Sequence, residues 1–141
     1  MELNSGSIDC IWNGFTMNGR EDEYTFSTPY VDNSQVIVVA ENSGINTPED
    51  LAGKTVGVQA ASAALELLQS DEKDGQKALA DTFGALNEFA DYNTAFTELQ
   101  AGALDALAID IGVANYQIKS RGEGYKNFRR NLKYRTICNC I

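Results

Sequence analysis

The stretch Asp50-Leu-Ala-Gly-Lys-Thr-Val-Gly-Val-Gln-Ala-Ala-Ser-Ala-Ala-Leu-Glu-Leu-Leu68 predicts the fold class of this chain. Its middle, Thr55–Val58, is short, apolar and rich in β-branched residues, which favours a strand covered on both faces. The small residues of Ala60–Ala64 follow, and the leucines after them indicate a helix. Such a helix start leaves backbone N–H groups free, which suits an anion. An ordinary strand–helix unit explains the same pattern, and from this stretch alone it is the favoured interpretation.

The rest of the chain alternates strands with helices. Further strands are predicted at Ile8–Trp12, Ser34–Ala40, Leu86–Ala90 and Ala103–Ile109. Helices are predicted from Thr47 as N-cap with Pro48 at the first position, at Gln76–Phe83, at Asn93–Leu99 ending at Gly102, and at Ile111–Ile118. This alternation predicts an α/β fold: a mixed, mostly parallel sheet with helices on both faces.

Composition excludes several classes of function. The 141 residues are 43% hydrophobic and 22% charged, enough for one domain with a core. The net charge of −9 argues against nucleic acid or an anionic membrane as partner, and the lack of histidine excludes histidine-based triads and metal sites. Cys138 and Cys140 are too close for an easy disulfide, and with Cys10 they are too few for a zinc site. No metal or cofactor is predicted.

Three polar residues stand where they could contact a ligand. Arg20, in a turn rich in glycine and asparagine, could pair with a carboxylate, or form a surface salt bridge with Glu21. Asp110 ends an apolar strand, where α/β sheets place ligands, and it could bind an ammonium group or cap the next helix. Ser62 could help to hold a carboxylate or act as a plain N-cap. These alternatives remain open from the residues alone. No candidate nucleophile has a histidine base, so covalent catalysis has little support.

Several motifs in fixed order carry a resemblance to a known family. They are Gly6-Ser-Ile-Asp9, Trp12-Asn-Gly-Phe-Thr16, Gly19-Arg20, Phe26-Ser-Thr-Pro-Tyr30, Asp50-Leu-Ala-Gly-Lys-Thr-Val-Gly-Val58 and Gly102-Ala-Leu-Asp-Ala-Leu-Ala-Ile-Asp110. Their joint order and spacing, from Leu3 to Tyr125, resemble the polar amino-acid-binding proteins of ABC importers. This family is extracytoplasmic. Its members have a periplasmic-binding-protein fold of two α/β lobes joined by hinge strands, with the amino acid held between the lobes.

The resemblance implies a set of ligand contacts. Matched to the family's carboxylate and ammonium contacts are Gly14, Thr16, Arg20, Ser62, Ala63 and Asp110. Matched to positions that select the ligand side chain are Asn13, Gln59 and Ile109. In this match Arg20 and the Ser62–Ala63 helix start hold the α-carboxylate, whereas Asp110 holds the α-ammonium. The family usually has glycine near Ala61, so this chain departs from the pattern there.

The resemblance also implies a domain division. Residues 1–33 correspond to a fragment of lobe one leading to the hinge, and residues 34–126 to lobe two. Residues 127–141 form an atypical basic tail. Back-translated with permitted codons and read one base later, the tail gives ILEETLSTEQYAIA, which is similar to the family's second hinge segment. The hypothesis is therefore that a one-nucleotide insertion near Lys126 shifted the reading frame.

The predicted function is thus the substrate-binding part of an amino-acid importer, not an enzyme. The expected partners are a polar amino acid and, for the full-length parent, an ABC permease. Self-association is expected through the inter-lobe surface or through Ser34–Ala40 as an unpaired strand. Two alternatives are an enzyme of the same fold, such as a cyclic-acid dehydratase, and a non-binding, self-associating domain. The parent is expected outside the cytoplasm, and the chain as written, without a signal peptide, inside it.

Overall fold

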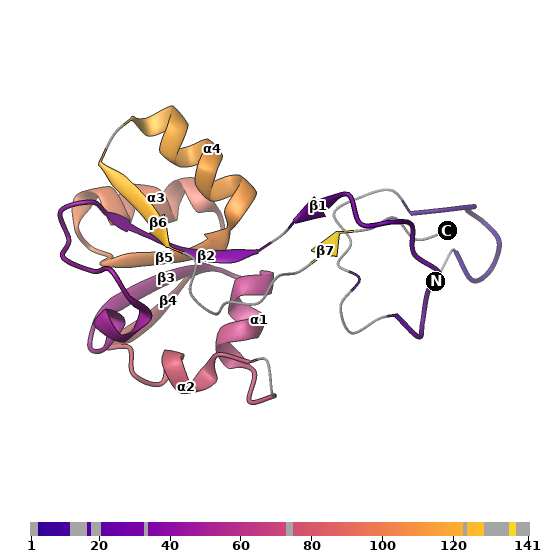
Figure 1. The fold of residues 1–141 in the computed structure, drawn as a ribbon, viewed down its shortest axis with the longest axis horizontal. Helices are drawn as coiled ribbons and strands as arrows, with labels where there is room; N and C mark the ends of the chain where they lie inside the picture. Colours follow the sequence, from indigo (N-terminus) through magenta and orange to yellow (C-terminus); the bar gives the residue numbers. More distant parts are fainter. Residues whose placement is uncertain are drawn as a thin grey trace. The chain divides into compact units, whose positions relative to one another are not determined.

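The computed structural model describes residues 3–11, 17, 21–32, 34–72, 75–122, 124–128 and 136–137 (Figure 1). The chain divides into a small unit, Met1–Ser34 with Tyr134–Ile141, and a large unit, Gln35–Lys133. The small unit contains β1 (Val31–Asp32) and β7 (Thr136–Ile137), which pair antiparallel. The strand predicted at Ile8–Trp12 is wrong over its described part, where Ile11 forms only an isolated bridge. Ile8 is exposed, so the alternation there buries no face.

The large unit is built on one mixed sheet of five strands. In the order β4-β3-β5-β2-β6, its members are Ala85–Phe89, Thr55–Gln59, Ala106–Asp110, Gln35–Ala40 and Tyr125–Phe128. β3 runs parallel to both β4 and β5, whereas β2 is antiparallel to β5 and β6. The predicted α/β fold with a mixed sheet is confirmed. β6 runs through Asn127 and Phe128, and so crosses the predicted start of the tail.

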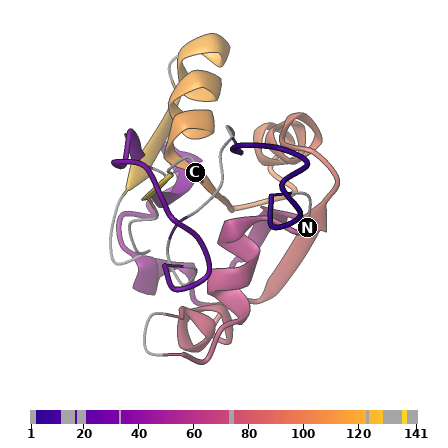
Figure 2. The same cartoon turned by 90° about the vertical axis from the view of Figure 1, so that its right-hand side faces the viewer.

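Helices cover both faces of this sheet. They are the 3-10 helix η1 (Pro48–Leu51), α1 (Ala63–Gln69), α2 (Lys77–Ala80), α3 (Tyr92–Ala101) and α4 (Ile111–Arg121). Figures 1 and 2 show α1 on one side of the sheet and α4 on the other. Alternate residues of each strand face the two layers: Ile37 and Val56 pack with α1, whereas Val38 and Leu107 pack with α3 and α4. Each such fully buried side chain stabilises the fold by about 1.5–3 kcal/mol.

The helix ends follow the chemistry expected from the sequence. Gly102 ends α3 with a left-handed backbone (φ 77°), and its N–H bonds to the last turn of the helix. Thr47 and Pro48 begin a helix as predicted, but it is a short 3-10 helix. At its start, Asp50 Oδ2 accepts the N–H groups of Asn46 and Thr47, each at 2.9 Å.

The expectation that residues 34–40 form an unpaired strand is wrong. β2 lies inside the sheet and is hydrogen-bonded to β5 on one side and to β6 on the other. Its four central residues, Val36–Val39, are at most 1% exposed. Because Asn127 and Phe128 supply partners along β2, this strand offers no free edge for a second chain.

Candidate functional site

One end of the sheet gathers all the predicted ligand residues that lie in the large unit. β3, β4 and β5 end there, and the antiparallel β2 begins there, so Gln35 lies opposite Asp110 and Gln59 opposite Phe89. Ser62 and Ala63 follow directly after β3, at the start of α1. In open α/β sheets, ligands bind outside the carboxyl ends of the strands. The fold thus brings these residues to the end of the sheet where a ligand is expected.

The carboxylate of Asp110 is held by two neutral donors. Gln35 Nε2 donates to Oδ1 at 2.8 Å, and the Tyr92 hydroxyl donates to Oδ2 at 3.0 Å. Gln35 is 1% exposed, whereas Asp110 is partly exposed. Among the residues that the structure describes, no lysine or arginine forms an ion pair with Asp110. Within the described part of the chain, this carboxylate is therefore held in place without a cationic partner.

A comparison with the neighbouring Asp91 shows that this arrangement is not ordinary helix capping. Asp91 follows β4 and caps α3, accepting the N–H of Thr94 at 2.9 Å and its hydroxyl at 2.8 Å. These bonds favour the charged carboxylate and lower the pKa of Asp91. Asp110 occupies the equivalent position before α4, but its side chain makes no capping bond. A cap stabilises a helix by about 0.5–2 kcal/mol, and the Asp110 side chain contributes none of this.

Tyr92 was not singled out by the sequence analysis. It is the first residue of α3, and burial is the main cause that raises the pKa of its phenol. The negative charge of Asp110 and the hydrogen bond to it raise that pKa further. Tyr92 therefore remains a neutral hydrogen-bond donor at physiological pH. The sequence could have indicated only its position at a helix start, directly after an apolar strand and the capping residue Asp91.

The loop between β3 and α1 is tied to the end of β4. The N–H of Ala60 donates to the Phe89 carbonyl at 2.9 Å, and Gln59 Nε2 donates to the Ala90 carbonyl at 3.1 Å. Ala61 has a left-handed backbone (φ 54°), a conformation that glycine adopts without strain. This backbone conformation gives a physical reason for the glycine that the family usually has near this position, and the alanine of this chain adopts it without that freedom.

At the start of α1, Ser62 acts as the N-cap. Its hydroxyl accepts the N–H of Leu65 at 3.2 Å, so the structural alternative for Ser62 is realised. Within the described residues, the N–H groups of Ala63 and Ala64 donate to no protein acceptor. The capping bond leaves these two donors available, so it is compatible with the predicted carboxylate contact.

The remaining predicted site residues divide into two cases. Ile109 is fully buried in the cluster that packs β5 against α3 and α4, so no ligand can touch its side chain in this structure, against the selectivity role predicted for it. Its inward direction follows from the alternation of β5, which points Asp110 to the other face. The four predicted residues of the first lobe lie outside the described residues: Asn13, Gly14, Thr16 and Arg20.

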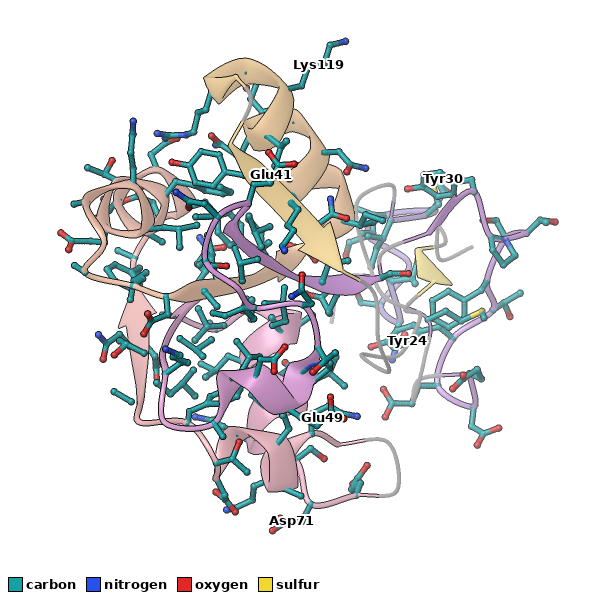
Figure 3. All side chains as sticks on the ribbon, turned by 60° about the vertical axis from the view of Figure 1, so that its left-hand side comes forward. Tyr24, Tyr30, Glu41, Glu49, Asp71 and Lys119 are labelled. Atoms are coloured by element: carbon teal, nitrogen blue, oxygen red, sulfur yellow. The ribbon has the colours of Figure 1, made fainter. Side chains whose placement is uncertain are left out.

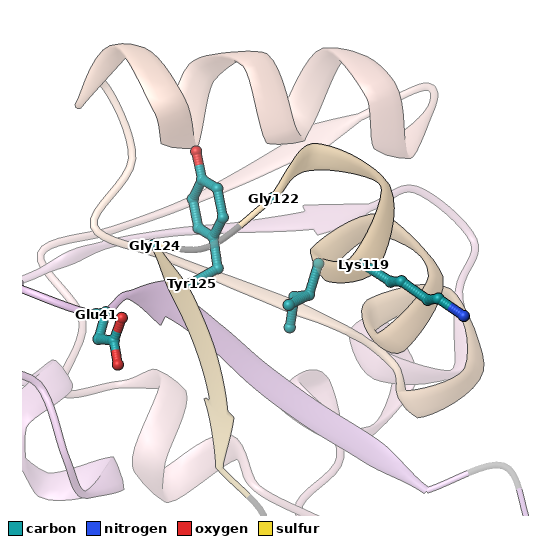
Figure 4. A pocket seen from close by; sticks show the side chains of 6 residues that line it. Glu41, Lys119, Gly122, Gly124 and Tyr125 are labelled. Atoms are coloured by element: carbon teal, nitrogen blue, oxygen red, sulfur yellow. The ribbon is translucent and has the colours of Figure 1, made fainter.

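A surface hollow of about 590 Å³ lies elsewhere, lined by Glu41, Ile118, Lys119, Gly122, Gly124 and Tyr125 (Figure 4). Glu41 follows the end of β2, whereas Asp110 lies opposite the beginning of β2, so the hollow and the candidate site are at opposite ends of this strand. Figure 3 shows exposed acidic side chains, such as Glu49 and Asp71, elsewhere on the large unit. Unlike the hollow, Asp110 lies at the carboxyl end of a strand, where α/β sheets bind ligands.

The family model of the bacterial extracellular solute-binding proteins, family 3, matches residues 1–110. The chain belongs to this family. PatH of Vibrio harveyi, a binding protein assigned to an amino-acid ABC transporter, is 45% identical over 76 residues, which are 52% of this chain and 31% of PatH. The arginine-binding extracellular protein ArtP of Bacillus subtilis is 30% identical over 123 residues, 86% of this chain and 45% of ArtP.

Solved structures of the family have the same fold. An ABC uptake transporter substrate-binding protein from Streptococcus pneumoniae, solved with bound histidine, superposes with a TM-score of 0.76 at 32% identity. The superposition covers 99% of this chain and 57% of that protein. This chain therefore spans about a third to a half of the curated relatives and somewhat more of the solved structure. The names of these relatives describe binding and transport rather than catalysis, in agreement with the prediction of a binding protein.

Two further properties concern the described ranges alone. No helix in them has the length and apolar character to cross a lipid bilayer. Their Cys, Asp and Glu side chains form no group of three that could hold a metal ion.

Proposed function

We propose that this solute-binding chain takes part in the capture of a polar amino acid for an ABC importer, and that Asp110 accepts the α-ammonium group. The observation that carries the proposal is the Asp110 carboxylate, which is partly exposed, held by two neutral donors and not used as a helix cap. A fixed anion at the carboxyl end of a strand favours a cationic group. A primary ammonium with three N–H donors matches the free acceptor positions of a carboxylate.

The α-carboxylate would be held by the N–H groups at the start of α1, beside Ser62 and Ala63. Their availability in the structure supports this role, and the resemblance assigns it. Gln59, at the end of β3, would contact the ligand side chain. In the first lobe, Arg20 and Thr16 would bind the carboxylate and the Gly14 carbonyl would accept from the ammonium. Asn13 would contribute to selectivity.

The proposal extends to the organisation of the parent protein. Residues 34–126 would form lobe two, and residues 1–33 would belong to lobe one and the approach to the hinge. The parent would act outside the cytoplasm and deliver its ligand to a permease. The relatives, which are extracellular binding proteins by name, support this part of the proposal.

Binding to the 141-residue chain tests the proposal. The probes are L-arginine and L-histidine, titrated while amide resonances are followed by NMR, which detects weak complexes. We expect shifts in the resonances of residues 59–63, 92 and 110. Asp110→Asn should weaken binding by about ten- to a hundredfold, because a hydrogen bond to a charged group contributes about 1.5–3 kcal/mol.

Asp91→Asn is the matched control, since it removes the same charge from the neighbouring helix start while keeping a capping side chain. This variant should bind as the wild type does. The proposal is refuted if neither amino acid shifts the resonances, or if Asp110→Asn binds as tightly as Asp91→Asn.

A further inference from the structure

The two donors to Asp110 bind different oxygens of its carboxylate. An ionised carboxylate has about four acceptor positions, two on each oxygen. Gln35 takes one position on Oδ1, and Tyr92 takes one on Oδ2. With only these two donors among the described residues, one position remains on each oxygen. The two donors come from different elements, β2 and α3, so together they fix the rotation of the carboxylate about its own axis.

The Gln35 donor is fixed by the sheet itself. Gln35 and Asp110 are directly opposite each other on β2 and β5, and such cross-strand neighbours place their side chains on the same face. Gln35 is also 1% exposed, which limits its motion. Its amide therefore reaches Oδ1 wherever the β2–β5 register is intact.

The Tyr92 donor is fixed by the start of α3. Asp91 caps this helix through Thr94, which sets the backbone of Tyr92. One turn later, Phe96 is fully buried beneath the same helix, in edge contact with the Tyr125 ring at 6.3 Å between centroids. The helix is thus held at both ends of the turn that carries Tyr92. A phenol has a single hydrogen to donate, and here it is directed to Oδ2.

From this geometry we infer that Tyr92 is a positioning residue for ligand recognition, which together with Gln35 holds Asp110 in the orientation that receives a primary ammonium group. The inference rests on the proposed function. It adds that Tyr92 acts through Asp110 and so affects the recognition of one ligand group, the ammonium, rather than the whole ligand. An arrangement prepared in advance improves binding by lowering the cost of ordering the site.

The test compares amino acids with analogues that lack only the ammonium group. The probe pairs are L-arginine with guanidinopentanoate, and L-histidine with imidazolepropionate. For each variant the measured quantity is the ratio of the two dissociation constants within a pair. Tyr92→Phe removes one oxygen atom and should lower the preference for the amino acid by about three- to tenfold. Asp110→Asn should lower the preference further, by about ten- to a hundredfold.

Tyr116→Phe is the matched control, because it makes the same change at an exposed tyrosine of α4. It should leave the ratio unchanged. Thermal unfolding of each variant is measured in parallel, since a merely structural defect would weaken both members of a pair equally and leave the ratio intact. An unchanged ratio in Tyr92→Phe overturns the inference.

The proposed function and the role of Tyr92 are refuted by different outcomes. If the wild type shows no preference for the amino acid over its analogue, both the proposed function and the role of Tyr92 are refuted. If the preference exists and is lowered in Asp110→Asn but is unchanged in Tyr92→Phe, the proposed function is supported and only the role of Tyr92 is rejected.

Discussion

Replacing Gly57 by alanine tests how closely Leu104, in the loop between α3 and β5, packs on β3. Gly57 is buried at the centre of this strand. A Cβ atom placed there would lie 2.5 Å from Leu104 Cδ1, 3.2 Å from Phe89 Cε2 and 3.3 Å from Leu107 Cδ1. The first distance is far inside van der Waals contact, so Leu104, which is only 3% exposed, must move.

Two opposing effects decide the sign. Alanine in a strand interior is favoured over glycine by about 0.5–1 kcal/mol, because it loses less backbone entropy on folding. Overpacking a close-packed core costs about 1–3 kcal/mol. The clash is therefore the larger effect, and we expect Gly57→Ala to destabilise the chain by about 1–2 kcal/mol.

Urea unfolding followed by circular dichroism measures this change as a shift of the transition midpoint. The same substitution is then made together with Leu104→Val, which removes the clashing methyl group. In that background Gly57→Ala should be neutral or slightly stabilising, with a coupling of about 1 kcal/mol between the two sites. Gly112→Ala is the control, because a Cβ there meets nothing within 4 Å and should stabilise α4.

The reasoning is refuted if Gly57→Ala stabilises the wild-type chain. It is also refuted if Leu104→Val leaves the cost of Gly57→Ala unchanged, because the cost would then arise from something other than this contact.

Four other predictions concern the helices around the site. Asp91→Ala should destabilise the chain above pH 3.8, the ordinary pKa of aspartate. Because folding lowers the pKa of Asp91, the stability difference between wild type and Asp91→Ala should fade as the pH falls through the pKa of Asp91 in the folded chain. Asp91→Asn should keep the cap at all pH values. Asp110→Asn should lower the pKa of Tyr92 toward 10.0 but not to it, since burial, the larger cause, remains; tyrosinate absorbance, with Tyr92→Phe as reference, measures this change. Because folding raises the pKa of Tyr92, the contribution of its neutral phenol to the free energy of unfolding should be complete below pH 10.0 and should decline as the pH rises above that value. Phe96→Leu should cost about 2 kcal/mol in urea unfolding, since it removes a fully buried ring and its aromatic contact, and a cost under about 0.5 kcal/mol would contradict the packing described.

Local patterns were sufficient to predict most of the large unit. The β-branched run Val36–Val39 indicated a buried strand, and Ala95, Phe96 and Leu99 indicated the inner face of a helix that ends at Gly102. In these segments propensity, periodicity and the terminating residue all favour the same structure. At Ile8–Trp12 the local pattern was not sufficient. A short apolar run forms a strand only where other strands pair with it, and the run itself does not show whether they do.

The site was predictable in position but not in its contacts. Asp110 was identified from its place after an apolar strand. Its hydrogen-bond partners depend on long-range geometry: Gln35 is 75 residues away in the chain and reaches Asp110 only through the β2–β5 register. The pairing of β2 on both sides was missed for the same reason, since its second neighbour is formed by residues that had been assigned partly to an atypical tail.

The contrast between the two aspartates has a consequence for how this protein would evolve. At position 91, selection for a stable fold is sufficient to keep the aspartate, because its carboxylate caps α3. At position 110 selection for stability and selection for function are opposed, since a serine or threonine there would secure α4 better than an aspartate that faces away from it. Under the proposed function, a gene copy that no longer needs to bind an amino acid should therefore lose Asp110 early and retain Asp91. Comparing the two positions across descendants would then distinguish copies that still bind a ligand from copies that only keep the fold.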